Sequence, residues 1–144
     1  MELIVKKFSE LTTGELYEIL KSRLEIFMLE QNIICQDLDD VDYVGSHYFF
    51  MENNRVIAYL RAFEGESKDV LMMGRVLTIE HKKGVGRELM TKAIEHIKAT
   101  TSYKKISLHA QKTAIGFYEK LGFVTVSPEF LEEGVVHVTM ECVL

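Results

Sequence analysis

The residues best suited to chemistry lie between positions 75 and 90, where an apolar, strand-like segment runs into two glycines and then into helical spacing. Gly84 and Gly86 lack the Cβ atoms that would hold a ligand away from the backbone. The N–H groups of a helix's first turn have no carbonyl partner inside the helix, and the helix dipole adds partial positive charge there. This arrangement is typical of an anion site, and we expect a pyrophosphate to bind it.

The predicted contacts to this anion follow one another along the loop and the helix start: Lys82, Lys83, Gly84, Val85, Gly86 and Arg87. Cations at the N-terminus of a helix oppose its dipole, so their presence indicates an anion that offsets them. A Walker loop needs Lys-Ser/Thr after its last glycine, where this sequence has Arg87-Glu88, and a dinucleotide fingerprint needs a third glycine. Both nucleotide motifs are therefore disfavoured, and a plain glycine turn is the remaining alternative.

The segment from Leu108 to Phe123 supplies a second set of candidate residues. It resembles a motif of the GNAT acetyltransferase superfamily, Asn-x-x-Ala-x-x-x-Tyr-x-Lys-x-Gly-Phe, at Gln111, Ala114, Tyr118, Lys120, Gly122 and Phe123. The cofactor motif of the same superfamily, Gln/Arg-x-x-Gly-x-Gly/Ala, is matched by His81-x-x-Gly84-x-Gly86. Nearly the whole chain is similar to the ElaA-like branch, from which it departs at His81, where Arg is more usual, and at His109, where Gln is usual.

The resemblance implies an α+β, acyl-CoA N-acyltransferase fold, with a mixed, mostly antiparallel sheet split between strands 4 and 5 and flanked by helices. It implies that the pantetheine arm of acetyl-CoA lies in this split, along the main chain of Leu77, Thr78 and Ile79. An N–H near Leu77 would polarise the thioester carbonyl. Tyr118 would protonate the departing thiolate, or else serve as a core aromatic, and Gln111 is either a cofactor contact or a helix-start residue.

The sequence identifies the base that deprotonates an acceptor amine less clearly than it identifies the cofactor contacts. Glu30, at the end of the first predicted helix, is our candidate, while His47, His109 and His137 are open to a structural or a catalytic reading. The acidic segment Asp37–Asp42 reads as a solvated loop, with attraction of a cationic amine as the alternative; it lacks the glycine and terminal glutamate of an EF-hand. Arg23 and Arg75 are expected to pair with acids such as Glu30.

The helices and strands that must position these residues can be predicted along the chain. Apolar residues at helical spacing predict helices from the Thr12–Glu15 capping box to Glu30, over 84–98 and over 113–121, the last ended by Gly122 in a left-handed conformation. Strands are expected at 2–8, 47–52, 55–64, 70–79, 105–110, 123–126 and 135–143, with a tight turn at Asn53-Asn54. Residues 31–46 are expected to form a loop.

The composition limits the classes of function. With 144 residues, the chain is expected to be one domain over 1–144, and its net charge of −5 gives no bulk attraction to nucleic acid. The two cysteines form no metal-site or disulfide pattern, no apolar run reaches the length of a membrane span, and the cytoplasm is the expected location.

These patterns predict an N-acetyltransferase that transfers the acetyl group of acetyl-CoA directly to an amine in a ternary complex, without a metal. A non-catalytic acyl-CoA-binding module and a nucleotide-binding protein are the alternatives. The sequence leaves the acceptor unidentified, and leaves open whether the protein is a monomer or a homodimer.

Overall fold

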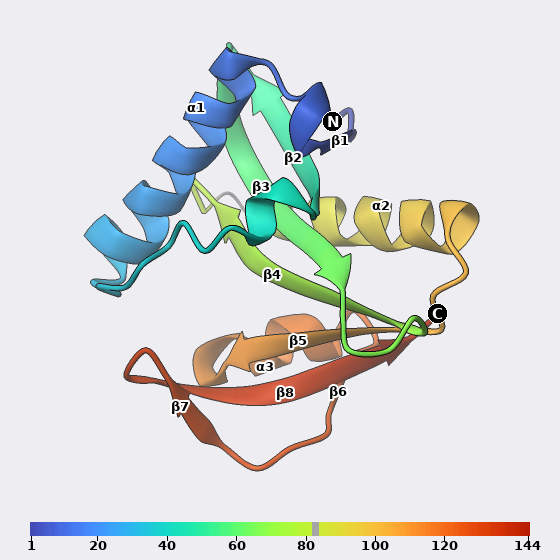
Figure 1. Cartoon of the computed structure of the whole chain (residues 1–144). Helices are drawn as coiled ribbons and strands as arrows, with labels where there is room; N and C mark the ends of the chain where they lie inside the picture. Colours follow the sequence, from blue (N-terminus) through green and yellow to red (C-terminus); the bar gives the residue numbers. More distant parts are fainter. Residues whose placement is uncertain (82–83) are drawn as a thin grey trace.

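Residues 1–81 and 84–144, the residues that the computed structural model describes, are built around one mixed sheet (Figure 1). The strand order is β1-β2-β3-β4-β5-β8-β6, and β7 pairs with β8. The strands are β1 (Ile4–Lys7), β2 (Ser46–Glu52), β3 (Arg55–Glu64), β4 (Val70–Thr78), β5 (Lys105–Gln111), β6 (Val124–Thr125), β7 (Phe130–Glu132) and β8 (Val135–Val143). Strands β4 and β5 pair in parallel, and the other pairs are antiparallel.

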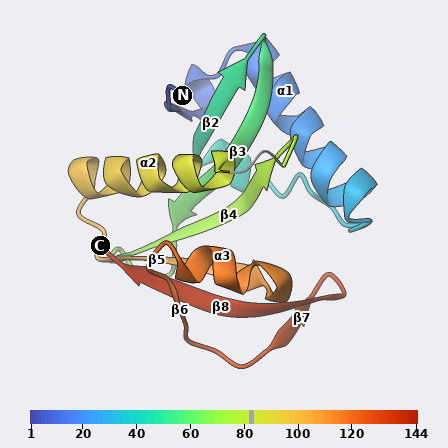
Figure 2. The same cartoon turned by 180° about the vertical axis from the view of Figure 1, so that it is seen from behind.

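Helices cover both faces of this sheet. The helical elements are α1 (Thr13–Arg23), the π-helical segment η2 (Leu24–Glu30), α2 (Val85–Thr100), α3 (Ile115–Glu119) and the short 3-10 turns η1 (Phe8–Glu10), η3 (Val41–Tyr43) and η4 (Lys112–Ala114). Helix α1 lies on one face, and α2 and α3 lie on the other (Figures 1 and 2). Each face therefore has its own apolar core: Ile19 of α1 packs with Tyr59 and Leu77, whereas Leu89 of α2 packs with Met73.

Several local expectations are confirmed. The Thr12 hydroxyl accepts the Glu15 N–H at 3.0 Å, and the Glu15 carboxylate accepts the Thr12 N–H at 2.8 Å, which completes the capping box. Asn53 and Asn54 both have positive φ in the β2–β3 turn, and Gly122 has φ of 96° after α3. The helix expected to run to Glu30 does so, but it changes from α to π geometry after Arg23.

The split in the sheet follows from where the pairing of β4 and β5 stops. Their register runs from Val70 opposite Lys105 to Met73 opposite Leu108. Beyond that point β4 continues to Thr78 and β5 to Gln111 without pairing to each other, and the two strands diverge in Figure 1. The expected split between the fourth and fifth strands is thus confirmed.

A bulge in β4 changes the face to which its side chains point. Gly74 pairs with Arg61 and Leu77 with Tyr59, so β4 has one residue more than β3 in this interval. Arg75 lies within it at φ 54°, which is uncommon for a residue other than glycine. Met73 therefore packs on the α2 side and Leu77 on the α1 side, although odd-numbered residues of a regular strand share one face.

Two parts of the chain differ from the expectation. Strand β7 was not predicted; it forms a hairpin with β8 through a turn in which Glu133 and Gly134 both have positive φ. Val41–Tyr43 form a 3-10 turn inside the segment expected to be a loop. Among the helices of the described residues, none combines the length and the hydropathy needed to cross a bilayer.

Candidate active site

A cavity of about 530 Å³ opens where β4 and β5 separate. Val76 of β4, His109 and Gln111 of β5, and Tyr118 of α3 line it, together with the segment that follows η2 and the β7–β8 hairpin. Its volume is typical of pockets that take small-molecule ligands. The structure thus brings two of the predicted site residues, Gln111 and Tyr118, to one cavity.

Tyr118 is held in place by aromatic neighbours. Its ring makes edge-to-face contacts with Phe117, with ring centroids 5.1 Å apart, and with Phe123, at 5.7 Å. The side chain is 8% exposed, and burial raises the pKa of its phenol above the usual value. The hydroxyl therefore stays protonated at neutral pH, as a proton donor must.

The segment predicted to bind an anion forms the start of α2. Gly84 caps the helix with φ of 91°, and the first helical hydrogen bond runs from the Glu88 N–H to the Gly84 carbonyl at 2.9 Å. The N–H groups of Val85, Gly86 and Arg87 precede that bond and have no helical carbonyl to bind. Lys82 and Lys83, two of the predicted contacts, lie outside the described residues.

Gly86 lies where the chain approaches its neighbours closely. A Cβ at this position would be 3.4 Å from Thr78 Cγ2 and 3.5 Å from Phe117 Cζ. The start of α2, the end of β4 and helix α3 thus converge around this glycine, and a larger side chain would fill the space between them.

The backbone of β4 and of the residue after it argues against two predicted contacts, those of Ile79 and Leu77. The Ile79 N–H is donated to the Ile57 carbonyl of β3 at 2.9 Å, so it is not available to a ligand in the split. Neighbouring residues of a strand direct their backbone groups to opposite sides, so Leu77, opposite Tyr59, shares the orientation of Ile79. Thr78 is the residue whose main-chain groups face away from β3, toward the split.

Two contacts tie the end of η2 to other parts of the chain. His81 Nε2 lies 2.8 Å from Glu30 Oε1, and the Gln111 amide donates to Gln31 Oε1 at 2.8 Å. Glu30, our candidate base, is thus engaged by His81 and is not among the described residues that line the cavity. Gln31 and Gln111 both line the cavity, so this hydrogen bond spans the split from η2 to β5.

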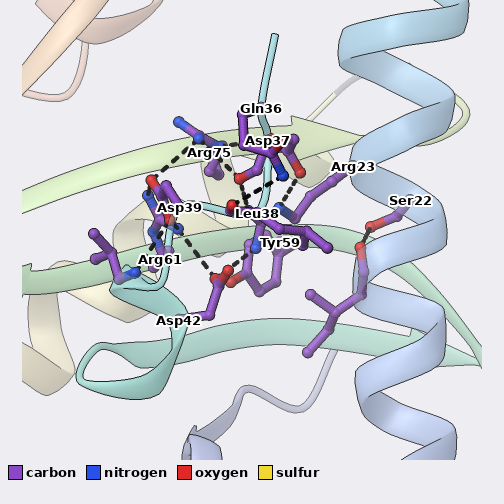
Figure 3. A network of polar contacts seen from close by, with 12 residues as sticks. Ser22, Arg23, Gln36, Asp37, Leu38, Asp39, Asp42, Tyr59, Arg61 and Arg75 are labelled. Atoms are coloured by element: carbon purple, nitrogen blue, oxygen red, sulfur yellow. Dashed lines mark hydrogen bonds and ion pairs between the residues drawn. The ribbon is translucent and has the colours of Figure 1, made fainter.

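The acidic segment is not a solvated loop. Figure 3 shows three of its carboxylates turned toward three arginines. Arg23 of α1 binds Asp37 and Asp42, Arg61 of β3 binds Asp39 and Asp42, and Arg75 of β4 binds Asp37 and Asp39. The expectation that Arg23 and Arg75 pair with acids is therefore confirmed, but the acids are aspartates of this segment rather than Glu30, which contacts His81. Three carboxylates neutralise three guanidinium groups, so this network gives the cavity little net charge.

The network is largely buried, and its arginines lower the pKa of Asp39 and Asp42. Arg23 is fully buried, and its Nη1 lies 2.6 Å from Asp42 Oδ1. Burial by itself would raise the pKa of Asp42, but the hydrogen bonds and charges of Arg23 and Arg61 outweigh it and lower that pKa. The segment 37–42 is thereby fixed to α1, β3 and β4 as one side of the cavity.

The histidines divide into structural and cavity-lining residues. His47 is fully buried between the Tyr59 hydroxyl, 2.7 Å from Nδ1, and the Asp42 carbonyl, 3.0 Å from Nε2; burial lowers its pKa, so it is a neutral structural residue. His109 and His137 line the cavity on either side of Glu132. Glu132 was not singled out from the sequence, because the strand that carries it was not predicted.

Within the described ranges, no group of three or more His, Cys, Asp or Glu side chains is placed to hold a metal ion.

Comparisons with known proteins agree with this geometry. Residues 39–144 match the family described as "Acetyltransferase (GNAT) domain". The Escherichia coli protein ElaA is 33% identical over 92% of this chain and 90% of its own, and its crystal structure has a TM-score of 0.90 at 30% identity, covering 99% of both chains. An acyl-CoA N-acyltransferase from Pseudomonas aeruginosa has a TM-score of 0.90 at 28% identity, again over 99% of both chains. An aminoglycoside 6'-N-acetyltransferase solved with coenzyme A has a TM-score of 0.75 at 12% identity, covering 97% of this chain and 96% of its own, which shows a common fold. The chain belongs to the GNAT acetyltransferase family.

Proposed function

We propose that this protein transfers the acetyl group of acetyl-CoA directly to an amine while both substrates are bound. The observation that carries this proposal is the position of Tyr118, a buried and protonated phenol lining the cavity at the point where β4 and β5 separate. A proton donor at this point serves a reaction whose leaving group is a thiolate.

The residues around the split fit the parts of acetyl-CoA. The first-turn N–H groups of α2 offer donors for the pyrophosphate, and Gly84 leaves the approach to them open, since a Cβ there would have no atom within 4 Å. The main chain of Thr78 offers a donor and an acceptor for the amides of pantetheine. The thioester would then lie beside Val76 and Tyr118, and a backbone N–H of β4 would polarise its carbonyl.

The first test concerns binding of the donor. Coenzyme A and acetyl-CoA are expected to raise the melting temperature of the protein, whereas NAD and ATP leave it unchanged; saturation at 100 times Kd adds about 2.7 kcal/mol to the free energy of unfolding. Differential scanning fluorimetry measures this. Catalysis is tested separately, by release of free thiol from acetyl-CoA across a library of amines. Stabilisation by coenzyme A without thiol release from any amine would instead identify a non-catalytic acyl-CoA-binding module.

Replacing Gly86 with valine is expected to weaken coenzyme A binding at least about tenfold, because a branched side chain at a helix start blocks the approach of a phosphate to the backbone. It would also press on Thr78 and Phe117, which a Cβ already contacts. The matched control is Gly14→Val, since Gly14 is the second residue of α1 as Gly86 is of α2. Isothermal titration with coenzyme A decides the question; equal affinity in the two variants would make Gly86 a turn residue only.

A further inference from the structure

Two side chains from separate strands meet at the wall of the cavity, on the side of β5 and the β7–β8 hairpin. His109 Nδ1 lies 2.7 Å from Glu132 Oε1, and both residues line the cavity. The imidazole also makes an edge-to-face contact with Phe130, with centroids 5.2 Å apart, yet its side chain remains 40% exposed. The ring is therefore fixed in orientation while one part of it stays accessible.

His109 and Tyr118 approach the cavity from opposite faces of the sheet. Leu108 and Ala110, the neighbours of His109 in β5, pack into the same core cluster as Tyr118. Because successive side chains of a strand point to opposite faces, His109 points to the face opposite Tyr118. A proton donor thus reaches the cavity from the α3 side, and an imidazole reaches it from the opposite face of the sheet.

The contact with Glu132 determines which nitrogen of His109 carries the proton. A carboxylate only accepts hydrogen bonds, so Nδ1 carries the hydrogen and Nε2 of the neutral ring holds a lone pair. No hydrogen bond among residues 1–81 and 84–144 engages that Nε2. Glu132 thus prepares the opposite nitrogen to accept a proton, as a carboxylate behind a catalytic histidine does.

The other titratable groups around the cavity are less suited to this task. Asp37 and Asp39 are bound by arginines, and burial raises the pKa of the Cys35 thiol. His137 donates from Nδ1 to the Val135 carbonyl at 2.7 Å, and its side chain is 8% exposed. Glu133, in the hairpin turn, is the remaining carboxylate of the lining. An imidazole matches neutral pH better as a proton acceptor than a carboxylate does.

We infer that His109 is the general base that deprotonates the acceptor amine, and that Glu132 is its positioning residue; this inference rests on the proposed acetyltransferase function. An ammonium group R–NH₃⁺ gives one proton to His109 Nε2, directly or through one water. The neutral nitrogen attacks the acetyl carbon, and a C–N bond forms. The C–S bond breaks, Tyr118 protonates the thiolate, and the second proton of the nitrogen returns to the Tyr118 phenolate. The products are the amide, free thiol and an imidazolium that releases its proton to water.

The kinetic test uses two probe amines with acetyl-CoA at neutral pH: ethanolamine, which is protonated, and hydroxylamine, which is neutral. His109→Gln is expected to lower kcat/KM for ethanolamine by about 100-fold and for hydroxylamine by less than about threefold, because only the protonated amine requires a base before attack. His96→Gln, on α2 away from the cavity, is the control and is expected to change neither. Added imidazole is expected to restore part of the ethanolamine activity of His109→Ala, a rescue that a purely structural histidine would not show.

The positioning role of Glu132 has its own readout. Glu132→Ala is expected to lower the ethanolamine activity by roughly 10-fold to 100-fold, the range found when a carboxylate that orients a metal-binding histidine is removed. Glu132→Gln keeps an acceptor oxygen for the Nδ1 hydrogen and is expected to fall between Glu132→Ala and wild type. Nitrogen-15 NMR of the histidine rings shows the tautomer without any acceptor present: the Nδ1–H form in wild type, lost in Glu132→Ala.

The outcomes separate the two levels of the proposal. A wild-type protein that releases no thiol with these two amines or with any amine of the library contradicts the acetyltransferase function itself. An active wild type whose His109→Gln variant keeps full ethanolamine activity contradicts only the role of His109, as does an Nε2–H tautomer in the wild-type spectrum. A large loss in Glu133→Gln with none in His109→Gln would assign the base to Glu133.

Discussion

Replacing Tyr118 with phenylalanine is expected to lower kcat by about 10²-fold to 10⁴-fold, the range for loss of a general acid, with the lower end expected because a thiolate leaves readily. The ring of phenylalanine keeps the edge-to-face contacts with Phe117 and Phe123, so the substitution removes the hydroxyl and leaves the packing. Affinity for coenzyme A should change little, because the lost interaction matters in the transition state. Steady-state kinetics with any working amine, beside titration with coenzyme A, measures both quantities.

The matched control for this substitution is Tyr48→Phe. Tyr48 is also buried, and burial raises its pKa to about 12, but it is not among the described residues that line the cavity. Its substitution is expected to leave kcat unchanged. If Tyr118→Phe also turned over within about threefold of wild type, Tyr118 would be a core aromatic only, and water would supply the proton.

Replacing Asp42 with alanine is expected to lower the free energy of unfolding by about 3–5 kcal/mol, the loss found when one partner of a buried ion pair is removed. Asp42 lies between Arg23 and Arg61, at 2.6 and 3.1 Å, and both arginines are buried. Without this carboxylate, three guanidinium groups share two carboxylates, and the excess positive charge stays out of water. Chemical denaturation with urea measures the change.

Asp69→Ala is the charge-matched control, because Asp69 is exposed and lies 3.8 Å from Lys104 at the surface, where a pair contributes about 0–1 kcal/mol. Equal losses in the two variants would contradict a special role for the buried network. Acid provides a second measurement: since the arginines lower the pKa of Asp42 below its unfolded value, its contribution is complete above that value and disappears as pH falls through the lowered pKa. Wild type should therefore lose stability below about pH 4 more steeply than Asp42→Ala.

Features determined by neighbouring residues could be predicted from the sequence. The capping box of α1, the Asn53-Asn54 turn, the start of α2 after two closely spaced glycines and the left-handed Gly122 each depend on a few adjacent residues. The antiparallel β2–β3–β4 meander follows from such turns.

Features determined by residues far apart in the chain could not be predicted from the sequence. Arg23, Arg61 and Arg75 come from three elements, and nothing in their spacing shows which of several acids each will bind. One residue, Gly134, could have indicated the β7–β8 hairpin, because it lies between Phe130–Glu132 and a β-branched run. The turn begins with Glu133, however, and glutamate indicates a tight turn less clearly than the asparagines of the β2–β3 turn do. Missing that hairpin also meant missing Glu132, which gives His109 its orientation.

The bulge at Arg75 has a consequence for how this family of sequences can change in length. Deleting one residue between Gly74 and Val76 would restore regular alternation in β4 and turn Leu77, Thr78 and the residues after them to the wrong faces. Leu77, which packs on the α1 side, would then point toward α2. The main-chain groups of Thr78 would face β3 instead of the split. Surface turns such as 65–68 tolerate insertions and deletions better. The number of residues between Gly74 and Leu77, in contrast, is fixed by the pairing of both residues with β3. Homologous sequences are therefore expected to differ in which residues occupy positions 74–76, but not in the number of residues in this interval.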